Sequence, residues 1–342
     1  MHPGGDPLSG IGACILDAEG LRLTSDEKRF FAEANPFGFI LFARNIDTPD
    51  QVRALCDELR AAVGREAPIT IDQEGGRVQR LRAPQWREWV PPLEHVAAAG
   101  HRAEEATYLR YRLIADELRD LGIDSNCAPL VDVAGDATHP FLKNRCYGTD
   151  PAQVARIGRA VADAMLEGGV LPVLKHIPGH GRARADSHME LPEVDAPRDE
   201  LEAVDFLPFK ALNGLPMGMT AHLVYSRIDD RPATLSPVMM QMIRDGIGFD
   251  GLVMTDDISM KALSGSLEDI AAGSIEAGCD VVLLCNASLD ERRAVAAASG
   301  HLSGASEARA ARAIAARQIP TEVDIPALEA KLDALISRRG DG

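Results

Sequence analysis

Aromatic residues and cysteines are scarce in this 342-residue chain. Aromatic side chains make up only 4% of it, whereas 46% of the residues are hydrophobic, so alanine, leucine, valine and isoleucine must build most of the core. The six cysteines form no Cys-x-x-Cys pair, and several of them fall within apolar runs. This pattern argues against a disulfide framework or a zinc ribbon and favours buried, reduced thiols.

Two further absences bear on location and partners. Every apolar run is far shorter than the roughly 18 residues that a membrane span requires. Residues 1–10 carry neither the basic patch nor the apolar segment of a signal peptide, so we expect a cytoplasmic protein without membrane association. The 36 basic and 52 acidic residues give a net charge of −16, which repels nucleic acids and anionic membrane surfaces.

Short apolar runs alternate with helical patterns along the whole chain. Eight runs are mostly apolar without strict alternation, as expected for parallel strands buried on both faces. They span residues 12–16, 38–42, 68–71, 125–130, 171–174, 216–220, 251–255 and 279–284. The helical patterns span residues 25–34, 51–63, 101–121, 151–167, 198–213, 236–245, 266–277, 305–318 and 325–338.

Eight strand–helix units predict one (β/α)₈ TIM-type barrel, an α/β fold whose active site lies at the C-terminal ends of the strands. A doubly wound open sheet is the alternative arrangement of the same elements. Because no Pro-, Gly- or Ser-rich linker divides the chain, we expect a single domain over residues 1–342, with the last two helices (about 305–339) closing or flanking the barrel. A closed barrel has no sheet edge to pair with another copy, so we expect a monomer.

Ionisable residues follow the predicted strands and would therefore meet at one pole of the barrel. They are the segment 72–80 after the third run, Asp132 and Arg145 after the fourth, Lys175, His176 and His180 after the fifth, His222 after the sixth, Asp256 and Asp257 after the seventh, and Asn286 after the eighth. An acid that ends an apolar strand, such as Asp256, either forms a salt bridge or takes part in chemistry. Asp257, one position further along, is expected to face away from the centre of the pole.

The segment after the fifth strand, residues 177–197, is long and carries the triplet Asp186-Ser187-His188. Loops of this length are commonly functional. In extended backbone, Asp186 and His188 point the same way, so the carboxylate can accept the imidazole N–H and raise its basicity. The pair then suits general acid/base catalysis near neutral pH, although a capping aspartate beside a solvated histidine is the alternative interpretation.

A metal-dependent hydrolase is a competing hypothesis for these residues. Its ligands would be His176, His180, His188, His222 and Asp256. His176 and His180 have the spacing that binds a metal on a helix, but Pro178 and Gly179 lie between them and remove that shared face. We therefore expect neither a metal nor another cofactor.

Four segments resemble glycoside hydrolase family 3, and in particular its single-domain bacterial β-N-acetylglucosaminidases. They are KHIPGHG with the following DSH (residues 175–188), DQEGGRVQR (72–80), Asn144-Arg145, and GLVMTDDISM (251–260). The resemblance covers nearly the whole chain, and its first motif is the most specific. Ile177, where an aromatic is common, and Ile258, where leucine is common, are small departures that leave the aglycone preference open.

The resemblance implies roles for individual residues. Asp256 resembles the catalytic nucleophile, and His188, paired with Asp186, resembles the general acid/base. The residues that resemble the groups holding a non-reducing N-acetylglucosamine are Asp72, Arg80, Arg145, Lys175 and His176. Most retaining glycosidases pair two carboxylates, so a histidine acid/base would be a departure from that pattern.

The implied reaction is hydrolysis with retention through a covalent glycosyl-enzyme. The implied substrate is a muropeptide fragment, N-acetylglucosamine β-1,4-linked to 1,6-anhydro-N-acetylmuramic acid, in cytoplasmic peptidoglycan recycling. Phosphorolysis, in which phosphate replaces water, is an alternative because a histidine acid/base tolerates an anionic acceptor. A sugar-binding protein without catalysis is the alternative from another class.

Overall fold

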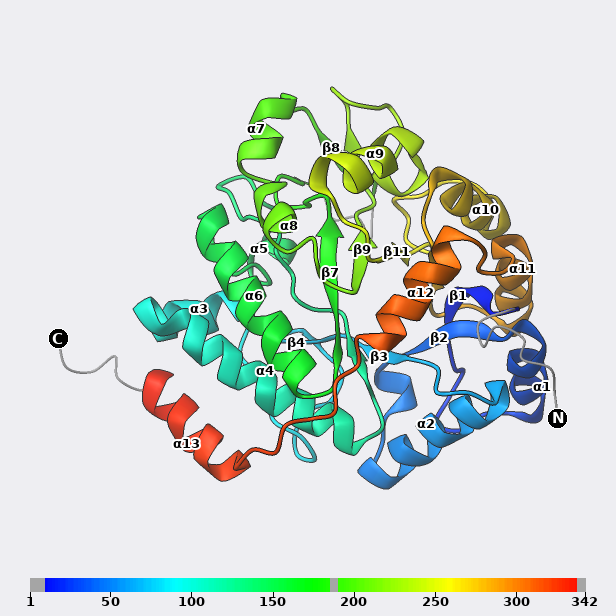
Figure 1. The fold of residues 1–342 in the computed structure, drawn as a ribbon, viewed down its shortest axis with the longest axis horizontal. Helices are drawn as coiled ribbons and strands as arrows, with labels where there is room; N and C mark the ends of the chain where they lie inside the picture. Colours follow the sequence, from blue (N-terminus) through cyan, green and yellow to red (C-terminus); the bar gives the residue numbers. More distant parts are fainter. Residues whose placement is uncertain (1–9, 185–189, 337–342) are drawn as a thin grey trace.

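The computed structural model describes residues 10–184 and 190–336. Within this part, eight parallel strands close into a barrel in chain order, which confirms the predicted TIM-type architecture (Figure 1). The barrel strands are β1 (Gly12–Asp17), β2 (Pro36–Leu41), β3 (Ile69–Ile71), β6 (Ser125–Asn126), β7 (Leu171–Ile177), β9 (Met217–Thr220), β11 (Leu252–Asp257) and β12 (Val281–Leu284).

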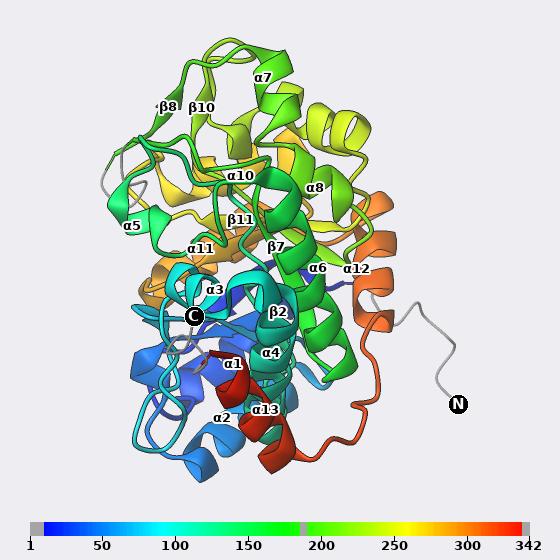
Figure 2. The ribbon, with the colours of Figure 1, turned by 90° about the vertical axis from the view of Figure 1, so that its left-hand side faces the viewer.

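Helices surround the barrel on the outside (Figures 1 and 2). They are α1 (Ser25–Ala34), α2 (Pro49–Val63), α3 (Pro92–Ala99), α4 (Ala103–Asp120), α5 (Pro140–Lys143), α6 (Pro151–Glu167), α7 (Arg198–Ala203), α8 (Leu207–Ala211), α9 (Pro237–Gln241), α10 (Leu267–Ala277), α11 (Leu289–Ser299), α12 (Ala305–Ala315) and α13 (Ile325–Ile336). Their starts follow local chemistry: Thr24 and Glu27 form a capping box at α1, and Asp150 caps α6 ahead of Pro151.

Two small sheets lie outside the barrel. One is the antiparallel hairpin of β4 (Gln73–Gly75) and β5 (Val78–Gln79), and the other pairs β8 (Glu193–Val194) with β10 (Val224–Tyr225). Figure 1 shows β8 and α7 beyond the C-terminal end of β7, and Figure 2 shows β10 beside β8. Both small sheets therefore extend the end of the barrel where a TIM-barrel active site lies.

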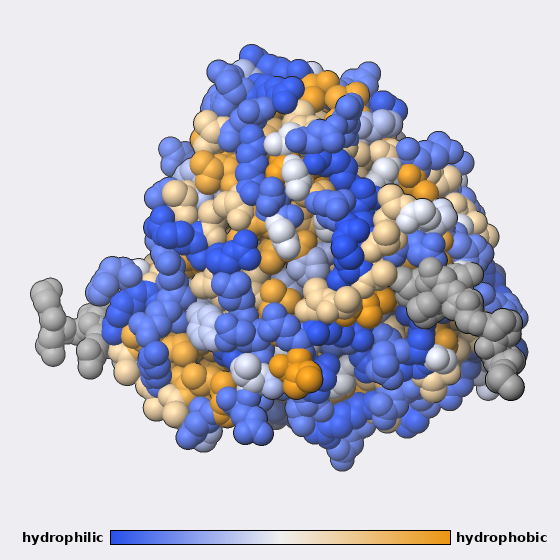
Figure 3. Space-filling view, in the orientation of Figure 1, coloured by the Kyte–Doolittle hydropathy of each residue, from blue (hydrophilic) through white to orange (hydrophobic). Residues whose placement is uncertain are grey.

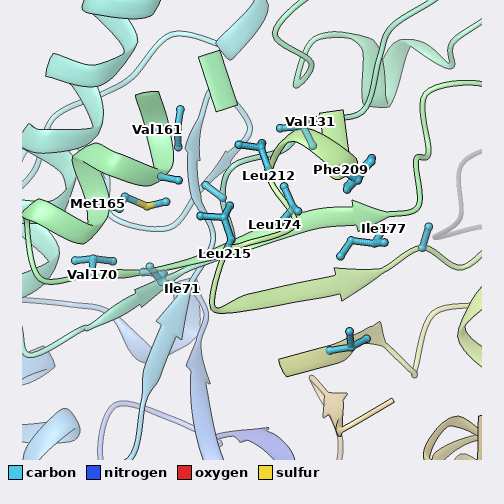
Figure 4. Close-up of a cluster of buried hydrophobic side chains, with 14 of the residues drawn as sticks. Ile71, Val131, Val161, Met165, Val170, Leu174, Ile177, Phe209, Leu212 and Leu215 are labelled. Atoms are coloured by element: carbon cyan, nitrogen blue, oxygen red, sulfur yellow. The ribbon is translucent and has the colours of Figure 1, made fainter. Parts of the chain in front are cut away.

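The interior of the barrel is a packed core. Side chains from the strands, including Ile15, Val173, Met219 and Leu283, form one buried cluster. Ala310 of α12 belongs to the same cluster and is fully buried, so α12 covers the N-terminal end of the barrel. A second cluster fills the space between strands and outer helices; Figure 4 shows part of it, with Val161 and Met165 of α6 beside the strands.

The structure differs from the predicted elements in a few places. The helix expected over 198–213 is two helices, α7 and α8, because Pro208 lacks the N–H that a helix interior needs and instead lies at the start of α8. The strand expected over 125–130 pairs regularly only at its first two residues. Pro129 has no N–H to donate, but its carbonyl still accepts from Lys175 N at 3.0 Å.

Three of the helices named above were not predicted. They are α3, which packs against α4, the four-residue α5, and α11, whose first turn is stabilised by a capping box of Ser288 and Glu291. At the C-terminus, α12 closes the barrel while α13 packs against α3 and α4 (Figure 2).

Polar residues dominate the face of the molecule in Figure 3, where hydrophobic residues form only small patches. The helices of residues 10–184 and 190–336 include none that is both long and apolar enough to cross a membrane.

Candidate active site

A pocket of about 380 Å³ lies at the C-terminal ends of the barrel strands. Six of the residues predicted from the sequence as site residues line it together, although 184 positions separate the first from the last. They are Asp72, Arg80, Arg145, Lys175, His176 and Asp256. The other two predicted residues, Asp186 and His188, lie outside the described residues.

Asp256 lies near the end of β11, with its side chain 21% exposed to the pocket. One carboxylate oxygen, Oδ1, accepts the backbone N–H of Asp257 at 2.8 Å, and the other lies 3.9 Å from Nε2 of His176. Burial by itself raises the pKa of Asp256, but His176, His222 and the Asp257 N–H outweigh it, so the pKa lies below its ordinary value. Asp256 is therefore an ionised carboxylate at neutral pH, with the lone pairs that a nucleophile requires.

His176 is held from behind by Asp132. The Asp132 Oδ2 lies 2.7 Å from Nδ1 of His176, while its Oδ1 accepts the backbone N–H of His180 at 2.6 Å. Asp132 is fully buried, and His176 and the other groups around it lower its pKa against the opposing effect of burial. A single carboxylate thus orients one imidazole and fixes the start of the long segment after β7.

His180 also lines the pocket, and its Nδ1 is buried without a hydrogen-bond partner among residues 10–184 and 190–336. Burial is the largest influence on this imidazole and lowers its pKa to about 4, which makes the ring neutral at neutral pH. Close packing holds its backbone in place: a Cβ on the next residue, Gly181, would lie 1.9 Å from the carbonyl oxygen of Val133. Position 181 therefore has room only for glycine, next to His180, the second imidazole named in the pocket.

Five charged side chains of alternating sign form a continuous row across one wall of the pocket. In spatial order this charged row is Arg145, Glu74, Lys175, Asp72 and Arg80. Glu74 accepts from Arg145 at 2.8 and 2.9 Å and lies 2.6 Å from Nζ of Lys175. Asp72 in turn lies 3.1 Å from Lys175 Nζ and 3.0 Å from Arg80.

The pKa shifts within the charged row follow from burial and pairing. Burial raises the pKa of both acids, but the neighbouring cations prevail: Arg145 and Lys175 bring the pKa of Glu74 to about 2, and Lys175 and Arg80 hold that of Asp72 well below its usual value. Burial opposes the charge of Lys175, yet the two carboxylates raise its pKa above its ordinary value. Asp72, Glu74 and Lys175 are therefore charged at neutral pH. The four residues of the row that line the pocket, Asp72, Arg80, Arg145 and Lys175, offer strong hydrogen-bonding groups to a polar ligand.

The motif from Asp72 to Arg80 owes its shape to neighbours that the sequence does not reveal. Gln73 accepts the backbone N–H groups of Arg80 and Leu81 at 3.0 and 3.1 Å, which closes the hairpin. Gly75 has a φ of +113°, and a Cβ there would lie 1.9 Å from the Arg110 guanidinium. Both the conformation and the space require glycine at this position.

Asp257 and His222 lie beside Asp256, but both form hydrogen bonds with other groups of the protein. Asp257 also lines the pocket, but its carboxylate accepts from Ser259 and from the backbone N–H of Cys285, and burial raises its pKa to about 6. His222 is buried between Thr234 and the carbonyl oxygen of Asp257, 3.1 Å from its Nε2. These two residues support the end of β11 beside Asp256.

Sequence reasoning did not single out Glu74, and it named Asp132 only by position. Glu74 falls inside the quoted motif, but its partners Arg145 and Lys175 lie on other strand ends, so spacing alone gives no signal. Phe141 and Arg77 at the pocket edge were also missed; the Arg77 guanidinium lies 3.3 Å from the centre of the Phe141 ring.

Within the described part of the chain, the residues expected as ligands in the metal hypothesis do not form a metal site. Over residues 10–184 and 190–336, no group of three or more His, Cys, Asp or Glu side chains has the arrangement to hold a metal ion. Asp132 and Thr234 occupy one ring nitrogen each of His176 and His222, respectively.

Comparison with known proteins shows the family of this chain. The model of the glycosyl hydrolase family 3 N-terminal domain matches residues 15–319, and the chain belongs to this family. A curated β-hexosaminidase of Methylococcus capsulatus is 40% identical over 279 residues, 80% of this chain and 82% of that protein.

Two solved structures give the same result at the level of the fold. Native NagZ from Neisseria gonorrhoeae has a TM-score of 0.78 at 30% identity, over 96% of this chain and 98% of that one. A family 3 β-N-acetylglucosaminidase from Paenibacillus sp. has a TM-score of 0.84 at 28% identity, over 97% of this chain and 69% of that one. The chain is accordingly a glycoside hydrolase of the β-N-acetylhexosaminidase type.

Proposed function

We propose that this enzyme is a retaining exo-β-N-acetylglucosaminidase that works through a covalent glycosyl-enzyme. The observation that carries the proposal is the ionised Asp256 carboxylate, which lies 3.9 Å from His176 and lines the same pocket as Asp72, Arg80, Arg145 and Lys175. A carboxylate with a lowered pKa is suited to attack on an anomeric carbon, and the polar side chains around it suit sugar hydroxyls.

In the first step, Asp256 Oδ2 attacks the anomeric carbon and the glycosidic C–O bond breaks. His188, oriented by Asp186, gives its proton to the departing oxygen, so the leaving group departs as a neutral alcohol. In the second step, His188 removes a proton from water, the water oxygen bonds to the anomeric carbon, and Asp256 leaves. Two inversions give net retention.

The charged row and His176 would hold the non-reducing N-acetylglucosamine. Asp72 offers carboxylate acceptors, while Arg80, Arg145 and Lys175 offer donors, and a sugar that left these buried groups unpaired would bind poorly. Asp132 keeps the His176 ring directed at the pocket, where its Nε2 faces Asp256 and the ligand.

For the natural substrate we propose muropeptide fragments with N-acetylglucosamine β-1,4-linked to 1,6-anhydro-N-acetylmuramic acid, consumed in the cytoplasm during peptidoglycan recycling by a monomeric enzyme. The aromatic ring of Phe141 and the Arg77 guanidinium at the pocket edge support an aglycone that combines an apolar sugar face with peptide carboxylates.

The test is release of nitrophenol from the β-N-acetylglucosaminide, compared with the β-glucoside, in the presence of a chelator. We expect turnover of the acetamido sugar alone and a β-configured first product by proton NMR. An α-configured first product would contradict the double displacement, and loss of activity with chelator would favour the metal-dependent hydrolase. Sugar 1-phosphate in phosphate buffer would establish phosphorolysis, and binding without turnover would indicate a sugar-binding protein.

A further inference from the structure

Glu74 lies between Arg145 and Lys175 in the charged row, but unlike the other four residues of the row it does not line the pocket. Its side chain is 2% exposed, and its carboxylate contacts both Lys175 and Arg145. Lys175 lies in β7 and Arg145 follows α5, so Glu74 joins two parts of the site that are far apart in the chain. Arg145 binds it through two N–H groups, the geometry that fixes a guanidinium most firmly.

The backbone of Glu74 is itself anchored. The Arg110 guanidinium is 1% exposed and donates to the carbonyl oxygens of Glu74 and Val90 at 2.5 and 2.9 Å. Gly75 leaves the space that this guanidinium fills. Because the backbone that carries the Glu74 carboxylate is fixed, we expect this carboxylate to determine the orientation of Lys175 and Arg145.

The negative charge of Glu74 also affects the balance of charges within the charged row. Arg80, Lys175 and Arg145 carry three positive charges, and Asp72 and Glu74 carry two negative charges. Without the Glu74 charge, Asp72 would be the one carboxylate left within the charged row to balance its three cations, with Asp256 elsewhere in the same pocket. Such a cluster is what phosphate- and sulfate-binding sites present.

We propose that Glu74 is a positioning and specificity-determining residue: its carboxylate directs Lys175 and Arg145 toward a neutral sugar and prevents the same cations from binding inorganic anions. This inference rests on the proposed role of the charged row in holding the sugar. Glu74 acts through Lys175 and Arg145 and is therefore not itself a catalytic residue.

The experiment measures steady-state hydrolysis of nitrophenyl β-N-acetylglucosaminide with increasing inorganic phosphate at constant ionic strength. The wild type is compared with Glu74→Gln, with Glu74→Asp, and with Glu117→Gln as a matched control. Glu117 is also mostly buried and pairs with an arginine, Arg87 at 3.0 Å, but outside the pocket.

For Glu74→Gln we expect KM to rise about ten- to hundredfold, the cost of losing charge-assisted hydrogen bonds, with a smaller change in kcat. Phosphate should inhibit this variant competitively while leaving the wild type and Glu117→Gln unaffected. Glu74→Asp restores the charge with a shorter reach, so it should lose the phosphate inhibition but keep a raised KM.

A purely structural ion pair would behave differently. Lower thermal stability with wild-type KM and no phosphate inhibition in Glu74→Gln would overturn the proposal. If Glu74→Gln does not fold, Glu74→Asp decides, because a wild-type KM there contradicts the positioning role.

A different result would contradict the proposed function itself: no hydrolysis of the acetamido sugar by the wild type. In that case N-acetylglucosamine binding by calorimetry replaces KM as the readout. Equal affinity of wild type and Glu74→Gln would then contradict the inference as well.

Discussion

The two ends of the barrel are built from the same residue types but use them differently. At the N-terminal end, Asp124 is 2% exposed, accepts the backbone N–H of Ile69 at 2.8 Å, and pairs with Arg60 and Arg317 at 3.2 Å each. Asp280 does the same for the N–H of Val253. At the C-terminal end, Asp72 and Glu74 pair with Lys175, and Asp256 lines the pocket with the backbone N–H of Asp257 as a hydrogen-bond partner.

The acids at the N-terminal end of the barrel stabilise the fold, whereas those at the C-terminal end are placed to bind or react with a ligand. A carboxylate that binds the start of a strand and two arginines from outer elements links chain segments far apart in sequence. A carboxylate such as Asp256, with one backbone N–H and a histidine at 3.9 Å, retains lone pairs directed at a ligand. Changes at the two ends should therefore affect different measurements.

The largest effect is expected at Asp256. Asp256→Asn removes the nucleophile and should lower kcat by about 10³-fold or more. Any change in the melting temperature should be small beside the loss of kcat, because asparagine has nearly the same size and can still accept the backbone N–H of Asp257. Kinetics on the nitrophenyl substrate and thermal denaturation check both parts, and a variant with more than a tenth of wild-type activity would contradict the assignment.

Asp124→Ala should show the opposite behaviour. It leaves Arg60 and Arg317 without their shared carboxylate and the Ile69 N–H without its acceptor, which should reduce the free energy of unfolding by about 3 kcal/mol. KM should be unchanged. Asp250→Asn at the same end, where the carboxylate side chain is 73% exposed, is the control and should change stability little in urea denaturation.

Asp132→Asn tests the second layer of the pocket. The amide can still accept the His180 N–H but interacts more weakly with Nδ1 of His176, so kcat/KM should fall about ten- to hundredfold. Retained circular dichroism separates misorientation of His176 from unfolding. Activity equal to that of the exposed control Asp195→Asn would show that His176 does not need this carboxylate.

The smallest expected effect concerns acid stability. Burial lowers the pKa of His180 from 6.5 to about 4, so the unfolded chain binds a proton over this range and the folded chain does not. The free energy of unfolding should therefore fall as the pH falls from 6.5 to about 4. Denaturation of His180→Gln should show a shallower pH dependence than the wild type, with His95 supplying part of the remaining slope. An unchanged slope would contradict this assignment.

Much of the fold was predictable because its signals are local. Buried parallel strands are short apolar runs, helices begin at residues such as Thr24 and Asp150, and eight such units imply a barrel. The helices that were missed or divided show the limit: α11 has a capping box but a polar sequence, and the break before α8 depends on one proline.

The candidate site, like the fold, was predictable from the sequence only in part. The amino-acid sequence by itself determined which residues stand at the strand ends, and with them the predicted Asp72, Lys175, His176 and Asp256. Only the tertiary structure decided that Glu74 joins Lys175 to Arg145, that Asp132 supports His176, and that Gly75 makes room for Arg110. The reason is physical: ionic and packing contacts act over a few ångströms in space, and barrel closure brings together residues that are 36 to 103 positions apart in the chain.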